Sequence, residues 1–236
     1  MLSVVLATYE GSQYISAQLD SIMEQLADGD EVVVSDDASS DGTAETVKRR
    51  NDPRIRLLCN PDRLGYVKNF ERAIASARGD SIVFSDQDDI WLPHKMSTIC
   101  RGLQIKACVV SDAVVVDSDL RELHASYFKL RGVSSFSFAA VFMKPRFIGA
   151  TMACRRGYLE TLLPIPDGVP HDFWITLNAL WDDELDIITD SLILYRRHPS
   201  CASVSATTSR RAASTILRER VALAKAMLLR RTCAKK

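Results

Sequence analysis

Short apolar runs and stretches of helical spacing alternate along the first half of the chain. Runs rich in Val, Ile and Leu predict buried strands at residues 2–7, 31–35, 55–59 and 81–85. The stretches between them carry apolar residues three or four positions apart, which predicts amphipathic helices at residues 15–26, 43–50 and 67–77. Strands that alternate with helices predict a mostly parallel sheet joined by right-handed crossovers.

The second half of the chain is less regular. Helices are expected after Pro93, at residues 134–143 and from His171 through Trp181. Apolar runs predict further strands at residues 105–111, 113–116, 147–153, 185–189 and 192–195. No internal repeat or clean linker interrupts the pattern, so we predict one compact α/β domain followed by a C-terminal helix.

Composition places the chain among soluble globular proteins. It has 236 residues, 25% of them charged and 47% apolar, which suits one large or two small domains. No run of eighteen apolar residues occurs, and the N-terminus enters a strand without a basic flank or cleavage site. We therefore expect a cytoplasmic protein. The 6 cysteines form no Cys-X-X-Cys pair, which argues against a zinc site or a disulfide framework.

The net charge of zero hides a basic C-terminus. Residues 208–236 carry nine Lys or Arg and the single acid Glu219. Their apolar residues are expected on one broad face of a helix: Ile216, Leu217, Val221, Ala224, Met227 and Leu228. Such a helix fits the surface of an anionic membrane, or it packs on the domain or on a second copy in a homodimer. Nucleic acid binding is disfavoured because no aromatic residues interleave with the basic ones.

An acidic segment follows the strand at residues 81–85. Asp86, Asp88 and Asp89 lie directly after the apolar run, and ligands of open α/β sheets bind at the carboxyl ends of the strands. A divalent cation, Mg²⁺ or Mn²⁺, would relieve the repulsion and bring phosphate oxygens of a substrate with it. The alternatives are a solvated turn or a cap for the helix after Pro93. The similar Asp117-Ser118-Asp119 segment is interpreted as a hairpin turn.

A second acidic strand end lies about fifty residues upstream. Asp36 and Asp37 follow the strand at residues 31–35, and Thr8 ends the first strand. Neighbouring strands would bring both acidic ends to one crevice. The alternative for Asp36 and Asp37 is turn chemistry, in which the carboxylates bond nearby backbone.

Several motifs resemble the family 2 glycosyltransferases, in the order in which that family has them. They are LATYEG, SDDASSDGT, NPDRLGYVKNF, FSDQDDIWLPHK and HDFW, and the DQDDIWLPHK and YRRH segments look most like bacterial rhamnosyltransferase-type members. The resemblance covers about residues 1–200. It implies a GT-A type fold with a Rossmann-like, mostly parallel central sheet flanked by helices. Residues 1–110 would bind the nucleotide-sugar donor, residues 111–207 the acceptor, and residues 208–236 would form the basic helix.

The resemblance also assigns donor-site residues. It places Thr8 and Asp37 against the nucleotide base, and a carboxylate there needs an imide N–H, so uracil or thymine fits better than cytosine. Arg63 would neutralise the diphosphate. Asp86 would face the ribose or a metal-bound water, and Asp88 would bind the metal. Asp89 would orient them, while Lys68 is a weaker candidate for the diphosphate.

The resemblance assigns the acceptor side as well. Asp172 in HDFW would remove the proton from the acceptor hydroxyl, or it would cap the following helix. His198 would complete the metal site, although YRRHPSCAS lacks the Gly and Asn that often follow this His. His171 is either a supporting partner or an ordinary loop histidine, and Gly149 resembles a tight turn under the acceptor.

Together these residues predict an inverting, metal-dependent glycosyltransferase. It would move a sugar, with rhamnose as the leading candidate, from a UDP- or dTDP-sugar to a hydroxyl of a surface polysaccharide precursor. That acceptor would be a glycan or a lipid-linked glycan, and the protein would meet it at the inner face of the membrane. A nucleotidyltransferase would need a Gly-rich phosphate loop, which ATYEGSQY does not supply. A phospho-acceptor signalling module would order its aspartates differently. A non-catalytic nucleotide-sugar binding protein stays open.

Overall fold

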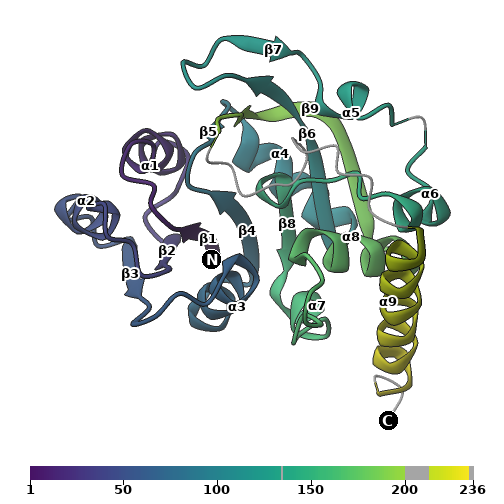
Figure 1. Cartoon of the computed structure of the whole chain (residues 1–236). Coiled ribbons are helices and arrows are strands. Elements are labelled where there is room, and N and C mark those ends of the chain that lie inside the picture. The colour runs from purple at the N-terminus through teal and green to yellow at the C-terminus, as the bar shows by residue number, and fades with distance from the viewer. Residues whose placement is uncertain (134, 200–212, 234–236) are drawn as a thin grey trace.

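The computed structural model describes residues 1–133, 135–199 and 213–233, and its strands form one sheet (Figure 1). The order across the sheet is β3-β2-β1-β4-β8-β6-β9-β5, with β7 paired to β6. The strands are β1 (Leu2–Thr8), β2 (Glu31–Asp36), β3 (Ile55–Cys59), β4 (Ser81–Asp86), β5 (Ile90–Trp91), β6 (Cys108–Val116), β7 (Glu122–His124), β8 (Met152–Arg155) and β9 (Leu185–Arg196).

The N-terminal half of the sheet is parallel, as the sequence predicts. β1 lies between β2 and β4, and β2 also pairs with β3, all in parallel register. β1 and β2 are buried along almost their whole length, which explains their continuous apolar runs. The parallel register brings the carboxyl ends of β1, β2 and β4 to the same edge.

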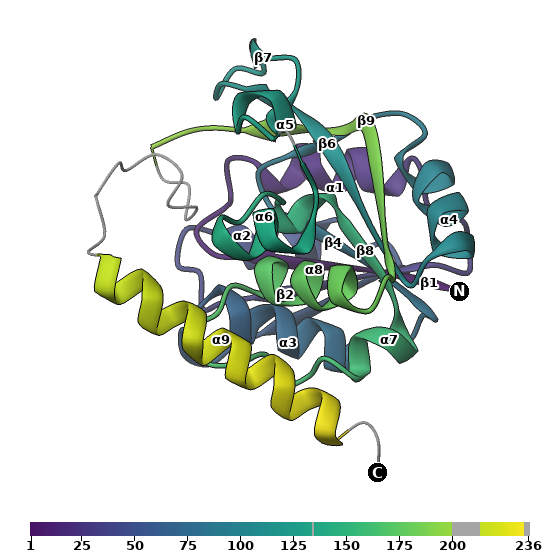
Figure 2. The same cartoon turned by 90° about the vertical axis from the view of Figure 1, so that its right-hand side faces the viewer.

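Helices cover both faces of the sheet (Figure 2). Figure 2 shows α1 and α4 on one side and α3, α7 and α8 on the other. The helices are α1 (Ile15–Met23), α2 (Thr43–Arg49), α3 (Tyr66–Ser76), α4 (Lys95–Ile105), α5 (Tyr127–Leu130), α6 (Phe138–Met143), α7 (Arg156–Glu160), α8 (His171–Trp181), α9 (Ala213–Cys233) and the 3₁₀ helix η1 (Gly149–Thr151). Their apolar faces and the sheet enclose one continuous core.

The C-terminal half of the sheet is mixed, which corrects the prediction of a mostly parallel sheet there. β8 pairs antiparallel with β4 and β6, whereas β9 is parallel to β6. The two strands predicted at residues 105–111 and 113–116 are one strand, because Asp112 is buried and its carboxylate is satisfied by the backbone N–H groups of Ala113 and Phe128. The strands predicted at 185–189 and 192–195 likewise join as β9, whose polar middle is exposed.

Three other expectations need smaller corrections. The apolar run at residues 147–153 contains η1 before β8 begins at Met152. Of the helix predicted at 134–143, the structure has α6 from Phe138, and Ser134 lies outside the described residues. The hairpin at Asp117 is confirmed, since its carboxylate accepts the backbone N–H groups of Asp119 and Arg121 and β7 returns antiparallel to β6.

The C-terminal helix α9 packs against α8. Leu223 and Met227 are buried, and Arg230 forms a salt bridge of 2.8 Å with Asp182 at the end of α8. Val221 and Leu228, predicted on the apolar face, are instead exposed. The side chains of Ile216 and Leu217 and the boundary at residue 207 lie outside the described part of the chain. Within the described residues, no helix combines the length and apolar character needed to span a membrane.

Candidate active site

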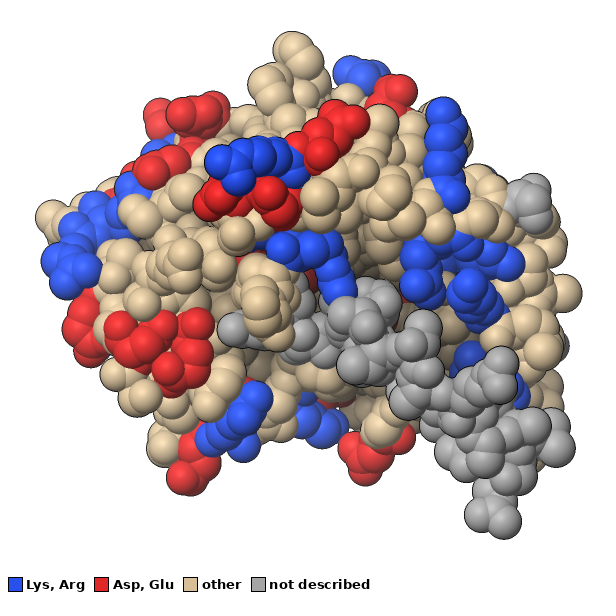
Figure 3. Space-filling view, turned by 45° about the horizontal axis from the view of Figure 1, so that its top comes forward, with Lys and Arg blue, Asp and Glu red and all other residues tan. Residues whose placement is uncertain are grey.

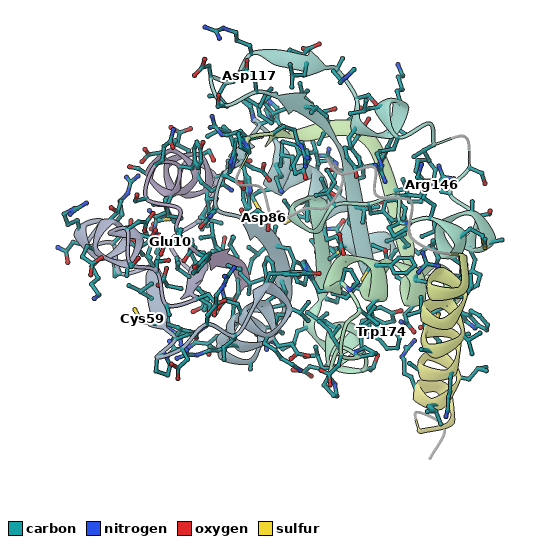
Figure 4. All side chains as sticks on the ribbon, in the orientation of Figure 1. Glu10, Cys59, Asp86, Asp117, Arg146 and Trp174 are labelled. Carbon is teal, nitrogen blue, oxygen red and sulfur yellow. The ribbon has the colours of Figure 1, made fainter. Side chains whose placement is uncertain are left out.

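The polar ends of three parallel strands meet at one edge of the sheet. In the register of the sheet, Thr8 lies opposite Asp36 and Ala7 lies opposite Asp86. Figure 4 places Asp86 near the middle of the molecule, where β4 ends between the two halves of the sheet. The edge that the sequence predicts for the donor is therefore assembled as expected.

The structure brings Asp88 and His198 together although 110 positions separate them. His198 Nε2 lies 2.8 Å from Asp88 Oδ2, and both side chains are mostly buried. The contact follows from the end of β9, where the Arg196 backbone N–H donates to Asp89 (3.0 Å) and Arg196 Nε donates to the Asp88 carbonyl (2.7 Å). The His198 ring also packs on Tyr14, with centroids 4.7 Å apart. Both predicted metal ligands thus lie at one point.

The acidic loop is electrostatically crowded. Burial and the charges of Asp88 and Asp172 raise the pKa of Asp86 to about 7. Burial and the charges of Asp88 and Asp86 raise the pKa of Asp89 well above its usual range. Asp89 Oδ2 is buried and has no hydrogen-bond partner within the described residues. These groups therefore favour the approach of a cation.

A buried lysine provides part of the compensation. Lys95 at the start of α4 is fully buried and donates to the Ala150 carbonyl (2.7 Å). Burial lowers the pKa of Lys95 to about 7, while the charges of Asp89 and Asp86 act against that shift. The Lys95 ammonium group is thus enclosed beneath the carboxylates and is poorly placed to contact a substrate.

The donor set at this point fits a divalent metal that a substrate helps to hold. Within the described residues no three His, Cys, Asp or Glu side chains form a complete protein cage. Asp88 and His198 would supply two ligands, and the Asp89 carboxyl beside them has one oxygen without a partner in the described residues. Mg²⁺ and Mn²⁺ are commonly bound in this way, with water and phosphate oxygens filling the other positions.

The carboxylates at the end of β2 hold the local backbone. Asp36 accepts hydrogen bonds from the Thr8 hydroxyl (2.8 Å) and from Ser39. Thr8 is buried, and its hydroxyl proton is already donated to Asp36. Asp37 is buried and accepts from the Asn60 side chain (2.7 Å) and from the backbone N–H groups of Leu64 and Gly65. The turn chemistry considered for both residues is present, and Asp37 fixes the loop that carries Arg63.

The two basic candidates of the donor half lie in different settings. Arg63 is exposed, and its guanidinium lies 3.8 Å from the centroid of the Tyr9 ring. Tyr9 directly follows Thr8, so Arg63 lies beside the predicted base site. Lys68 is paired with Glu71 at 2.9 Å on the exposed side of α3. The structure therefore brings Arg63, and not Lys68, to the site.

Asp172 lies in the first turn of α8 and faces the same region. The residue that caps α8 is Pro170, so the alternative assignment of Asp172 as the cap is wrong. Burial raises the pKa of Tyr66 and of Tyr127, and the Asp172 charge raises both further, as it does for Asp86. The half-buried Asp172 carboxylate therefore lies within electrostatic reach of Asp86 at the acidic loop and of two tyrosines.

His171 is a core residue. Its ring is 4% exposed, stacks on Phe84 (5.6 Å) and lies 4.3 Å from the Phe70 centroid. Burial lowers the pKa of His171, so the imidazole is held neutral. A Cβ added to Gly149 would lie 2.5 Å from His171 Nε2. Gly149 is thus required for close packing under the first turn of α8.

Three residues near the site escaped the sequence analysis. Gln87 accepts from the Tyr9 N–H (2.8 Å) and donates to the Tyr9 carbonyl (2.9 Å), which ties the first loop to the acidic loop. Lys95 gave no signal because a Lys at a helix start is usually solvated. Tyr127 begins the four-residue helix α5, which is too short to give a periodic signal. Only the position of Gln87 inside the acidic motif could have suggested a role.

Comparisons with known proteins agree with this geometry. A family model described as "Glycosyl transferase family 2" matches residues 3–198. The chain is 26% identical over 216 residues to the UDP-Glc:alpha-D-GlcNAc-diphosphoundecaprenol beta-1,3-glucosyltransferase WfgD of Escherichia coli. That alignment covers 87% of this chain and 79% of WfgD.

Solved structures show the same fold. S. aureus TarS residues 1–349 in complex with UDP-GlcNAc matches with a TM-score of 0.72 at 18% identity, over 94% of this chain and 66% of that one. The mannosyltransferase PcManGT from Pyrobaculum calidifontis, in complex with GDP-Man and Mn²⁺, matches with a TM-score of 0.61 at 26% identity, over 80% and 54% of the two chains. The expected GT-A type α/β fold is confirmed.

Proposed function

The chain belongs to the family 2 glycosyl transferases, and from that premise we propose an inverting, metal-dependent transfer of sugar from a UDP- or dTDP-sugar to an acceptor hydroxyl. The observation that carries the proposal is the Asp88–His198 contact of 2.8 Å beside Asp86, at an edge that the Asp172 charge also reaches. Family membership decides against the nucleotidyltransferase and signalling alternatives.

The donor site would be built from the strand ends. Asp88 and His198 would hold a divalent cation, which when bound supplies Lewis-acid assistance to the departing nucleoside diphosphate. Asp86 would face the ribose, and Arg63 would approach the diphosphate. We propose Asp37 and Thr8 for the base, with Asp37 offering its remaining acceptor capacity to a uracil or thymine imide.

The acceptor proton would pass to Asp172. The carboxylate lies in the first turn of α8, at the positive end of the helix dipole. From there it would take the proton of the incoming hydroxyl, whose oxygen attacks the anomeric carbon as the diphosphate leaves. One displacement without a covalent intermediate inverts that carbon.

The names of relatives narrow the candidate substrates. WfgD is named for a UDP-Glc donor and a diphosphoundecaprenol-linked acceptor. We therefore propose a UDP-hexose as the first donor to test, and the rhamnosyl donor stays a prediction from the motifs. A lipid-linked glycan acceptor would place the protein at the cytoplasmic face of a membrane. The outward side of α9, with exposed Val221, Lys225 and Leu228, would supply the contact. A homodimer also stays a prediction.

Replacing Asp172 by Asn tests the proposed base. The amide keeps the shape and cannot accept a proton, so transfer from a UDP-hexose to a lipid-linked acceptor should fall by about 10²- to 10⁴-fold. Donor affinity, measured by calorimetry, should stay at the wild-type value. Asp190→Asn, on the exposed middle of β9, serves as the matched control. Wild-type turnover in Asp172→Asn would remove Asp172 from the mechanism.

A further inference from the structure

A basic cluster lies on the acceptor side of the site. Residues 125–159 contain no Asp or Glu, and the part around α5 and α6 carries Lys129, Arg131, Lys144 and Arg146, which we call the basic cluster. None of the four forms a salt bridge within the described residues. Figure 3 shows a group of Lys and Arg on the right-hand side of this face with little Asp or Glu beside it, whereas basic and acidic residues are mixed on the left.

The two arginines of the cluster are close together and short of acceptors. Arg146 Nη1 donates to the carbonyl of Gly132, the residue after Arg131, over 3.3 Å. The Nε atoms of Arg131 and Arg146 are both buried without a partner in the described part of the chain. Because a buried unpaired donor costs free energy, the pair is suited to an added anion.

Other half-buried arginines of this protein have at least one polar partner in the described residues. Arg54 binds Asp52 (2.9 Å), and Arg230 binds Asp182 (2.8 Å) and Asn178 (2.9 Å). Arg156 Nε donates to the Gly79 carbonyl (2.6 Å). Within the described residues the Arg131 side chain makes no hydrogen bond, and its guanidinium lies 5.9 Å from the centroid of the Tyr127 ring. Arg156 Nη2 and Arg230 Nε are also buried without a partner in the described residues, but both side chains are held by other polar contacts. Arg131 differs from them because it has neither an ion pair nor a side-chain hydrogen bond there.

The cluster stands on a packed support. The rings of Phe128, Phe136 and Phe147 contact one another with centroids 5.0 to 6.0 Å apart. These residues flank Arg131 and Arg146 on either side in the sequence. The two guanidinium groups are consequently held in place by the core.

Tyr127 connects the cluster to the proposed base. Burial raises the pKa of the Tyr127 hydroxyl, the Asp172 charge raises it further, and the charges of Arg131 and Arg197 lower it. Both Asp172 and Arg131 are therefore close enough to act on one hydroxyl group. Arg220 of α9 lies 4.8 Å over the ring of Phe173, the residue after Asp172. In Figure 4, Arg146 lies between α5 and α6, apart from Asp86 and the donor edge.

Exposed apolar side chains flank the basic cluster. Leu130 is 46% exposed beside Arg131, and Met143 is 66% exposed beside Lys144. Phosphate groups alone would not need them, whereas an acceptor with an apolar chain next to its phosphates would cover both.

We propose that Arg131 and Arg146 bind the phosphate groups of a lipid-linked diphosphate acceptor, with Leu130 and Met143 against the first part of its apolar chain. The inference rests on the proposed glycosyl transfer and assigns the phosphate site of its acceptor. Guanidinium groups suit phosphate because they donate two parallel hydrogen bonds. The site is separate from the donor diphosphate, which belongs beside Asp88 and His198.

Calorimetric titration of the full chain with farnesyl diphosphate tests the site. The variants are Arg131→Gln, Arg146→Gln and the double variant, with Arg101→Gln on the exposed side of α4 as the matched control. We expect each single change to weaken binding by about tenfold and the double change to weaken it further. Farnesol should not bind, and inorganic pyrophosphate should bind more weakly than farnesyl diphosphate.

Titration of the same proteins with UDP and Mn²⁺ separates the two proposals. Unchanged nucleotide affinity in the double variant, with unchanged thermal unfolding, would show that only the acceptor site was altered. Wild-type farnesyl diphosphate affinity in the double variant would overturn the assignment, and so would nucleotide binding without any farnesyl diphosphate binding. Equal affinity for pyrophosphate would overturn the role of the apolar chain. If the folded wild-type protein binds neither UDP with Mn²⁺ nor farnesyl diphosphate, the proposed function itself is refuted.

Discussion

Gly149 and His171 form a contact in which backbone and ring leave no space for a side chain. The His171 imidazole is enclosed by Phe70, Phe84 and Gly149, and neither ring nitrogen has a partner within the described residues. A neutral imidazole can remain there because burial lowers its pKa. The ring therefore acts as an aromatic wedge that sets the start of α8, and with it the position of Asp172.

Gly149→Ala should disturb this wedge. The new Cβ would approach His171 Nε2 to 2.5 Å, and overpacking of this kind costs about 1–3 kcal/mol in the free energy of unfolding. We also expect turnover to fall, because the first turn of α8 must shift. Denaturant unfolding and transfer assays would measure both effects. Gly157→Ala in α7, where a Cβ meets nothing within 4 Å, is the control and should leave turnover unchanged without lowering the free energy of unfolding.

Asp37 shows how far a single residue could be predicted. Its position after a strand was clear from the sequence, and so were its two alternative roles, a contact with the nucleotide base or hydrogen bonds within a turn. The structure adds its three hydrogen bonds to Asn60, Leu64 and Gly65. Those partners could not be predicted because they depend on the path of a loop with no periodic pattern.

At the scale of elements, Glu31 joins several parts of the sheet. It accepts from Ser3 of β1 (2.7 Å), from Arg56 of β3 (2.7 Å) and from the Arg78 N–H after α3 (2.6 Å). Burial raises the pKa of Glu31, but these hydrogen bonds outweigh it and hold the pKa below the usual 4.5. The ionised carboxylate therefore stabilises the folded protein.

The pH dependence of unfolding should reveal this contribution. A group whose pKa is lowered by folding stabilises fully above its unfolded pKa, and the stabilisation is lost as the pH falls through its folded pKa. Glu31→Gln should cost about 2 kcal/mol at pH 7, and its stability should decline less than that of the wild type below pH 4.5. Exposed Glu24→Gln is the control. Parallel wild-type and Glu31→Gln curves would contradict the account.

The packing of α9 can be tested with two identical changes. Leu223 is 2% exposed and Leu228 is 57% exposed on the same helix. Leu223→Ala should lower the free energy of unfolding by about 2 kcal/mol or more, and Leu228→Ala by no more than about 0.5 kcal/mol. Chemical denaturation measures both. Equal effects would mean that α9 does not dock on α8 as described.

Strands and helices could be predicted from the sequence where a single pattern of apolar residues ran along the whole element. The strands before Asp36 and Asp86 are buried on both faces, and their continuous apolar runs gave bounds within a residue of β2 and β4. The second half failed where polar residues lie inside strands. Asp112 suggested a break in β6, yet its carboxylate finds its partners within the fold. The partners of antiparallel strands such as β8 have no local signature.

At the scale of the whole molecule, one sheet spans both halves of the chain, and the site forms where they meet. β9 lies beside β6 in the C-terminal half and pairs with β5, which immediately follows the acidic loop. This return carries His198 to Asp88. The family resemblance predicted both residues, but their direct contact and the buried Lys95 beneath the carboxylates required the folded chain.

The most direct test of the account is calorimetric titration with UDP and dTDP, each with and without Mn²⁺. Wild-type protein, Asp88→Ala and the control Asp119→Ala, from the exposed hairpin triplet, would be compared. We predict nucleotide binding that requires Mn²⁺, is lost in Asp88→Ala and is kept in Asp119→Ala. Equal nucleotide affinity with and without Mn²⁺ would contradict a metal-dependent donor site at Asp88. The absence of binding of either nucleotide to the folded wild-type protein would contradict it as well.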